Sequence, residues 1–243
     1  MLEHTGVRVI PGVSPKRVFD DHYARYHFVT EHISTFGKSV LDVACGTGYG
    51  SMHLANQGAA EVVGVDLSEE AIEYARMHYS HPKLRFAIGD VTNLALPSGY
   101  FDIVVSFETL EHIKNYEGLL QETYRVLKAN GLFCLSTPNR TITSPYGRVP
   151  INPYHAQEFM LDEFLHLLHL YYSHVKLFGQ HVIPRQYTNI VVRRLISLIT
   201  KVSIRFGGPD LQTDIYALVG GPDVEEFSLK RSVPRYIVAV CRK

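Results

Sequence analysis

The sequence has few cysteines, no excess charge of either sign and no long apolar run, and each absence narrows the class of protein. Basic and acidic residues balance, so the overall charge does not indicate a nucleic-acid or acidic partner. The three cysteines lie far apart, which favours buried thiols in a reducing compartment over a disulfide framework. No apolar run approaches about 18 residues, and the N-terminus lacks a signal-like pattern. We therefore expect a cytoplasmic protein with no transmembrane segment and no nucleic-acid partner.

What is present is enough apolar sequence, 46% of 243 residues, for one domain with a sizeable core. Short apolar runs alternate with segments of helical periodicity, and their links are short. This alternation predicts an α/β protein with a doubly wound, mostly parallel sheet. The predicted strands are 40–43, 61–65, 84–88, 101–107, 132–136, 174–178 and 236–240. The predicted helices are 16–36, 49–57, a segment that begins at the N-cap Ser68, 119–127 with its stop at Asn130–Gly131, and 161–171.

The chain divides into four stretches within that single domain. An N-terminal helical arm covers 1–36, and the core covers 37–137. A proline-containing loop follows at 138–157. Loops of this length are unusual in compact domains, so we expect it to be either functional or disordered. An insertion at about 183–233 contains a predicted helix with basic residues at 189–201 and a predicted loop at 203–233. The arm helix either packs on the sheet or covers a ligand. For the predicted helix at 189–201, packing in the core or against a partner is favoured over contact with a membrane or with a phosphorylated acceptor.

The most informative stretch runs from Val40 to Gly50, where a predicted strand ends in three glycines at alternate positions. Glycine permits a tight turn and lets a ligand approach the backbone, and the following helix offers free N–H groups. A strand, a glycine turn and a helix form the nucleotide-site element of open α/β sheets. The glycines do not match the Gly-x-Gly-x-x-Gly pattern of nicotinamide sites, and Asp42 would repel a pyrophosphate. The stretch therefore predicts a positively charged adenosine ligand.

Acidic residues follow the next two strands. Asp66 ends the second strand, where its carboxylate can accept both hydroxyls of a ribose, and Leu67 beside it can pack on an adenine. Asp90 follows the third strand, in reach of an adenine amino group. Each acid alone could be a helix cap or a solvated turn. Together they occupy the edge where such sheets bind ligands.

The run from Val40 to Ala55, then 64–68, 89–90, 101–106 and 125–132, resembles the class I S-adenosylmethionine-dependent methyltransferases. The resemblance implies a Rossmann-like sheet of seven strands whose last strand is antiparallel. It implies S-adenosylmethionine as cofactor and S-adenosylhomocysteine as product, with Gly46 and Gly48 at the methionine part, Asp66 at the ribose and Asp90 at the adenine. The expected cofactor-binding residues are Asp42, Ala44, Gly46, Gly48, Asp66, Leu67, Asp90, Val91, Phe107 and Tyr26.

Three flanking motifs, at 108–112, 136–139 and 152–155, resemble a narrower group of methyltransferases found with sugar and polysaccharide biosynthesis. A saccharide hydroxyl is a poor nucleophile near neutral pH, so a general base should contribute to methyl transfer. Glu111, His112 and His155 are the expected catalytic residues, because each lies on a segment that leaves the carboxyl edge of the sheet. Each could instead be structural: a helix cap for Glu111, a carbonyl-bonded ring for His112 and a solvated ring for His155.

These patterns favour an O-methyltransferase for a saccharide or glycosylated metabolite. A small aromatic or quinone-like acceptor is the alternative among enzymes, and a noncatalytic cofactor-binding protein is the alternative outside them. We expect no metal, because the sequence shows no compact ligand spacing and His166 and His169 fit a leucine-rich helix. The sequence leaves homodimerisation open.

Overall fold

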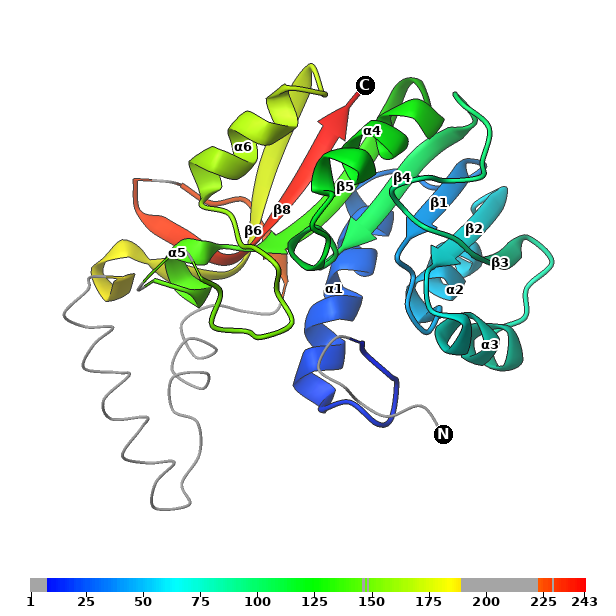
Figure 1. Cartoon of the computed structure of the whole chain (residues 1–243), viewed down its shortest axis with the longest axis horizontal. Coiled ribbons are helices and arrows are strands. Elements are labelled where there is room, and N and C mark those ends of the chain that lie inside the picture. The colour runs from blue at the N-terminus through cyan, green and yellow to red at the C-terminus, as the bar shows by residue number, and fades with distance from the viewer. Residues whose placement is uncertain (1–7, 146, 148, 189–222, 229) are drawn as a thin grey trace.

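The computed structural model describes residues 8–145, 147, 149–188, 223–228 and 230–243. It contains one sheet with the strand order β3-β2-β1-β4-β5-β8-β6-β7 (Figure 1). The strands are β1 (Ser39–Val43), β2 (Glu61–Asp66), β3 (Leu84–Ile88), β4 (Phe101–Phe107), β5 (Leu127–Pro138), β6 (His174–Pro184), β7 (Val224–Glu225) and β8 (Ser232–Arg242).

The sheet confirms the expected α/β architecture. Strands β1 to β5 pair in parallel, and the last strand, β8, runs antiparallel between β5 and β6. Among the described residues the sheet has one strand more than the seven expected. The additional strand is β7, a two-residue strand that pairs antiparallel with Gly179 and Gln180 of β6.

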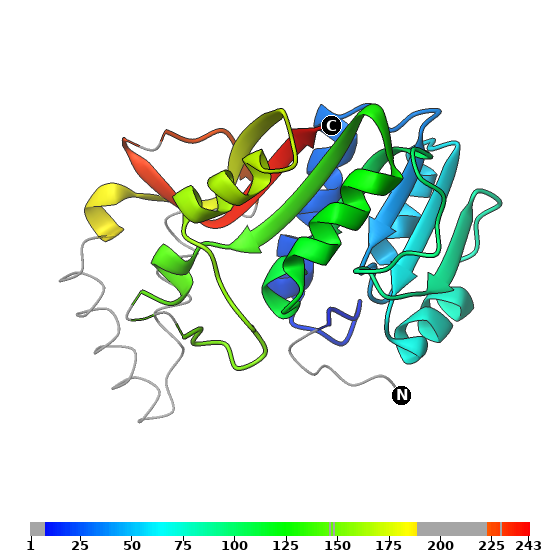
Figure 2. The same cartoon turned by 45° about the horizontal axis from the view of Figure 1, so that its top comes forward.

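Helices cover both faces of the sheet. They are α1 (Lys16–His32), α2 (Tyr49–Asn56), α3 (Glu69–His78), α4 (Tyr116–Val126), α5 (Arg140–Thr143) and α6 (Leu161–His169), with short 3-10 turns η1 (Leu110–His112) and η2 (Arg185–Thr188). Leucines of α4 and α6 share one buried cluster with alternate residues of the central strands. Residues of α1 and α2 share the cluster on the opposite face. The rotated view in Figure 2 shows α4 and α6 lying together on one side.

Several predicted boundaries are wrong. The helix predicted at 119–127 is α4, which begins at Tyr116 and ends at Val126, and residues 127–131 already belong to β5. Asn130 has the positive φ (63°) expected of a helix stop, but this conformation lies at an irregularity in the pairing of β4 with β5. The arm helix ends at His32, four residues early, and α6 ends at His169. Strand β6 extends six residues beyond the predicted 174–178.

The insertion predicted at about 183–233 falls largely outside the described residues, and so does the helix predicted at 189–201. In the described parts, Val224 and Glu225 form β7, and β8 begins at Ser232, so these positions of the predicted 203–233 loop are strand. Among the described residues, no helix combines the length and apolarity needed to cross a membrane.

Two glycines at the start of α2 fix the packing beneath the glycine turn. Gly48, the N-cap of α2, has a φ of 85°, and a Cβ there would lie 2.7 Å from atoms of Ala75 and Phe86. At Gly50, a Cβ would lie 2.0 Å from the ring of Tyr26. A side chain at either position would therefore displace α1 or α3 from the turn.

The start of the loop at 138–157 pairs with the residues that follow its end. Asn139 and Phe159 form a parallel bridge, and Arg140 N–H donates to the Phe159 carbonyl at 2.9 Å. The first residues of the loop form α5, which is capped by the Asn139 side chain on Thr141 N–H.

Candidate functional site

A cavity of about 530 Å³ opens at the carboxyl ends of β1, β2 and β4. This volume is typical of small-molecule sites. Its walls come from the turns that follow these strands and β3, from α1 and from the N-terminal arm. The lining residues are Arg8, Val9, His22, Tyr26, Ala44, Cys45, Gly46, Tyr49, Asp66, Leu67, Asp90, Val91, Thr92, Phe107, Glu108, Thr109, His112, Ile113 and Asn115. A larger cavity, about 790 Å³, lies between the C-terminal end of α1 and β6, and no predicted site residue lines it.

The glycine turn is attached to the end of β2 through Asp66. Gly46 N–H donates to Asp66 Oδ2 at 2.8 Å, and Ser68 N–H donates to Oδ1 at 2.9 Å. Gly46 has a φ of 55°, and its backbone lines the cavity beside Ala44. A carboxylate has about four lone-pair sites, so each Asp66 oxygen keeps an acceptor position for a ligand.

Asp42 lies behind the cavity wall and does not line it. Its carboxylate is fully buried and accepts hydrogen bonds from Ser51 Oγ at 2.6 Å and Tyr26 Oη at 3.1 Å. Tyr26 does line the cavity, and its ring meets Phe107 edge-on. Gly48 is likewise absent from the lining. Of the expected cofactor-binding residues, Asp42 and Gly48 therefore do not line the cavity, and Asp42 is connected to it through Tyr26.

Burial raises the pKa of Asp42 to about 7, even though the hydrogen bonds from Ser51 and Tyr26 oppose the shift. The folded chain then binds a proton at this site that the unfolded chain releases above its ordinary pKa. Asp42 therefore contributes stability that is fully present below about pH 4 and is lost as the pH rises towards 7.

We predict that Asp42→Asn removes this part of the pH dependence. Between pH 4 and pH 8, the free energy of unfolding of the unsubstituted chain should fall by up to about 4 kcal/mol more than that of the variant. Urea unfolding of both proteins across this range measures the difference. Parallel pH profiles for the two proteins would contradict the prediction.

Near the ends of β2 and β3, the cavity is bordered by Leu67, Asp90 and Val91. Asp90 is exposed, and its Oδ1 accepts hydrogen bonds from the backbone and side chain of Thr92, both at 2.8 Å. These bonds lower the pKa of Asp90. Leu67 is 70% exposed, which leaves an apolar surface at the cavity mouth. This part of the cavity therefore combines apolar side chains with a carboxylate.

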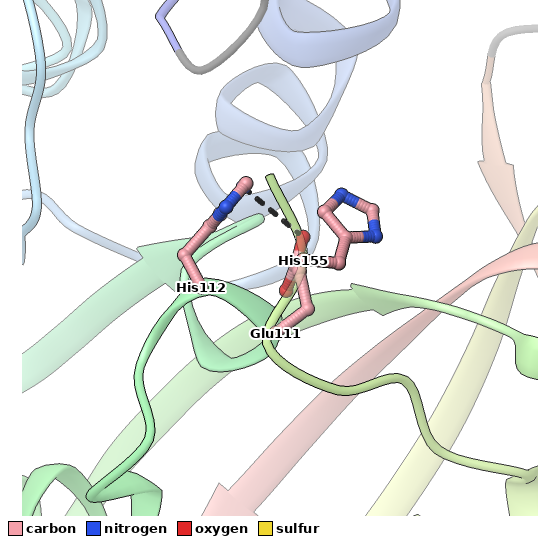
Figure 3. A group of neighbouring side chains, drawn as sticks. All are labelled: Glu111, His112 and His155. Atoms are coloured by element: carbon pink, nitrogen blue, oxygen red, sulfur yellow. Dashed lines mark ion pairs between the residues drawn. The ribbon is translucent and has the colours of Figure 1, made fainter. Parts of the chain in front are cut away.

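The three predicted catalytic residues lie close together beyond the end of β4, where His112 lines the cavity (Figure 3). Glu111 and His112 lie on η1, whereas His155 comes from the loop at 138–157. His112 Nε2 lies 4.0 Å from Glu111 Oε1, and the rings of His112 and His155 meet edge-on at 4.9 Å. The loop is held to η1 because the Glu111 carbonyl accepts hydrogen bonds from the N–H groups of Ala156 and Gln157.

The hydrogen bonds of His112 fix its tautomer. Nδ1 lies 2.9 Å from the Tyr154 carbonyl, which can only accept, so Nδ1 donates and Nε2 keeps its lone pair in the neutral ring. Burial lowers the pKa of His112, which favours this neutral form. Of the three predicted catalytic residues, only His112 lines the cavity.

Two residues that line the cavity, Glu108 and His22, were not among the expected site residues. Glu108 adopts a positive φ (50°), and its Oε1 accepts a hydrogen bond from Ser136 Oγ at 2.7 Å. The buried guanidinium of Arg25 lies 3.6 Å from the same oxygen. Glu108 opens the motif at 108–112 that carried the resemblance, so its position in that motif was the available signal.

An open α/β sheet with a glycine turn after β1 and acids after β2 and β3 defines a nucleotide-type binding site. Residues 41–135 match a family model described as a methyltransferase domain. A protein of Mycolicibacterium smegmatis named as a probable S-adenosylmethionine-dependent methyltransferase is 34% identical over 169 residues, which are 69% of this chain and 63% of that protein. A ubiquinone biosynthesis O-methyltransferase of Pseudomonas entomophila is 33% identical over 128 residues, 51% of this chain and 55% of that protein.

Solved structures share the fold over most of the chain. The YcgJ protein of Bacillus subtilis superposes with a TM-score of 0.61 at 18% identity, over 91% of this chain and 98% of that one. The chain spans about three fifths of the length of the first curated relatives that it matches. The chain is therefore similar to the class I S-adenosylmethionine-dependent methyltransferases in residues 41–135 and in its fold. S-adenosylmethionine is the cofactor of that class, and S-adenosylhomocysteine is its product.

Proposed function

We propose that this chain binds S-adenosylmethionine in the 530 Å³ cavity and catalyses transfer of its methyl group to a hydroxyl of a saccharide or glycosylated metabolite. The observation that carries the proposal is the layout of the cavity. Asp66 and Asp90 line it where β2 and β3 end, and His112, with its unprotonated Nε2, lines it beyond the end of β4, on the other side of β1. A cofactor and an acceptor can therefore meet within one site.

The cofactor-binding roles follow from the free acceptor positions. Asp66 would accept the two ribose hydroxyls while it holds Gly46 N–H, so the glycine turn and the ribose share one carboxylate. Asp90 would accept from the adenine amino group, with Leu67 and Val91 on the faces of the ring. Tyr26, held by Asp42, would border the methionine part. The residues present fit this cofactor.

When bound, S-adenosylmethionine supplies a methyl group that is already activated by its sulfonium. The chain then has to orient the acceptor oxygen in line with that methyl group and remove the hydroxyl proton. As the O–CH₃ bond forms and the S–CH₃ bond breaks, the hydroxyl proton passes to His112 Nε2. The resulting positive ring keeps its Nδ1–H bond to the Tyr154 carbonyl and lies beside Glu111.

A phenolic hydroxyl of a quinone-like metabolite is the second candidate acceptor. The observation that favours it is the 33% identity to proteins named ubiquinone biosynthesis O-methyltransferases, over about half of the chain. A phenol is more acidic than a sugar hydroxyl and depends less on a base. A noncatalytic cofactor-binding protein is disfavoured by the exposure of His112 Nε2 to the cavity.

The test is transfer of labelled methyl from S-adenosylmethionine to a panel of acceptors. The panel contains mono- and oligosaccharides, glycolipids, catechols and short-chain demethylated quinols. Label incorporation into saccharides only is the expected result. Incorporation into quinols only supports the second acceptor, and S-adenosylhomocysteine binding without incorporation into any panel member argues against catalysis.

A further inference from the structure

We propose that His22, on α1, is a second acceptor-binding residue, which bonds an oxygen of the acceptor next to the oxygen that receives the methyl group. The inference rests on the proposed function, because it adds a contact to the same acceptor. His22 lines the cavity together with His112. Neither nitrogen of the His22 ring has a hydrogen-bond partner in the part of the chain that the structure describes.

The face of α1 that carries His22 is turned towards the cavity. Tyr26 follows four residues later, which is about one helical turn, and it lines the same cavity. The Tyr26 ring meets Phe107, the last residue of β4, edge-on at 5.0 Å. His112 reaches the cavity from η1, just beyond that strand. The two histidines therefore approach the cavity from different elements, and an acceptor can contact both.

The turns of α1 on either side of His22 are anchored to β6. His181 Nε2 lies 2.9 Å from Asp21 Oδ1, and Gln180 Nε2 donates to the Asp21 carbonyl at 2.8 Å. Arg25 Nε donates to Gln180 Oε1 at 2.9 Å. Asp21 and Arg25 are both buried. These contacts fix the backbone that carries His22, so its ring can hold a ligand oxygen in a defined position.

The ring of His22 differs from those of the buried histidines that pack against α1. His53 lies within hydrogen-bond distance of Tyr23 Oη, at 2.8 Å, and of Thr30 Oγ1, at 3.0 Å. His181 bonds Asp21. Polar groups inside proteins generally have such partners. His22 is half-buried and has none among the described residues, and a ligand in the cavity would supply them.

The surroundings of His22 keep its ring neutral. Burial lowers the pKa of His22 well below its ordinary value, and the charge of Arg25 and the nearby ring of His112 lower it further. A neutral imidazole has one N–H donor and one nitrogen that accepts. Such a ring suits an uncharged hydroxyl oxygen, which both donates and accepts, better than a carboxylate or a phosphate, which a charged side chain would bind. This chemistry favours the acceptor over the carboxylate of the cofactor.

The two histidines then have different roles. His112 Nε2 takes the proton of the reacting hydroxyl, as proposed above, and His22 exchanges no proton. It would hold a neighbouring oxygen, so that one hydroxyl among several is aligned with the methyl group. A site that hydrogen-bonds a substrate oxygen discriminates against analogues that lack it, because its own polar group is then left unpaired. His22 is therefore a specificity-determining residue.

The first test is the rate at which His22 reacts with diethyl pyrocarbonate, which modifies unprotonated ring nitrogens, as read by peptide mass spectrometry. The probes are S-adenosylhomocysteine alone and S-adenosylhomocysteine with each member of the acceptor panel. We expect S-adenosylhomocysteine alone to leave the rate unchanged. At least one panel member should lower it by about tenfold when present at roughly ten times its dissociation constant. His27, an exposed histidine of α1, should react equally throughout.

The second test is the split between KM and cofactor affinity. His22→Ala should raise KM for the acceptor by about tenfold or more and leave the affinity for S-adenosylhomocysteine unchanged. His22→Asn keeps a donor and an acceptor and should recover part of the loss. His27→Ala is the matched control, because His27 lies on the same helix and does not line the cavity. A merely structural role of His22 would not give this pattern.

The inference is overturned if S-adenosylhomocysteine alone protects His22, if no panel member protects it, or if KM in His22→Ala equals that of His27→Ala. Protection requires no turnover, so it tests His22 even in a chain that transfers no methyl group. Protection without labelled transfer to any acceptor contradicts the proposed methyl transfer alone. Transfer to an acceptor that leaves His22 unprotected contradicts the role of His22 alone.

Discussion

Asp66→Ala is expected to weaken the binding of S-adenosylhomocysteine by a factor on the order of 10² or more. Each bond from a ribose hydroxyl to the Asp66 carboxylate is charge-assisted and contributes roughly 1.5–3 kcal/mol, and both would be lost. The substitution also removes the acceptor of Gly46 N–H and Ser68 N–H, so the glycine turn loses its attachment to β2. Isothermal titration calorimetry with S-adenosylhomocysteine measures the change.

Two further variants show whether the loss of affinity comes from the Asp66 carboxylate. Asp66→Asn keeps one acceptor oxygen and should lie between the unsubstituted chain and Asp66→Ala. Asp162→Ala removes an exposed acid from the first turn of α6 and should leave the affinity unchanged. If Asp66→Ala bound the ligand as tightly as Asp162→Ala does, the ribose would not be held at the end of β2.

His112→Ala is expected to lower kcat for methyl transfer by about 10²–10⁴-fold, with little change in the affinity for S-adenosylhomocysteine. The ring supplies the Nε2 lone pair that would accept the proton of the acceptor hydroxyl. Asp66 and Asp90, to which we assign the cofactor, follow β2 and β3 on the other side of β1, so their contacts should persist. Single-turnover transfer of labelled methyl to the acceptor found in the panel gives the rate.

His78→Ala is the matched control for His112→Ala. The His78 ring also bonds a backbone carbonyl, that of Tyr74 at 2.8 Å, but it lies at the end of α3 and does not line the cavity. It should retain full turnover. Unchanged turnover in His112→Ala as well would show that His112 does not activate the acceptor.

The strands of the core could be predicted because their patterns are local. Phe101–Phe107 is almost continuously apolar, as expected of a central strand covered on both faces, and its bounds are confirmed. The end of α4 could not be predicted, because Asn130–Gly131 is equally compatible with a helix stop and with an irregularity in a strand. The pairing of β5 with β4 decides between them, and that pairing depends on residues distant in the sequence.

The site could be predicted in part for a similar reason. Asp66 and Asp90 follow their strands, and the parallel sheet brings such residues to one edge. Asp42 lies inside β1, and a side chain within a strand points to a face of the sheet rather than beyond its end. That is why Asp42 meets Ser51 and Tyr26 instead of the cavity. The contact of His155 with His112 depends on hydrogen bonds that sequence spacing does not encode.

The bridge between Asn139 and Phe159 has a consequence for engineering and for evolutionary divergence. It makes the intervening segment a cassette whose two ends are joined outside the strands of the sheet, so we expect that it can be exchanged without a change in the sheet. The cassette includes His155, and its backbone holds Glu111 in place. We therefore expect an exchanged cassette to change the position of His155 and the support of Glu111 at the same time.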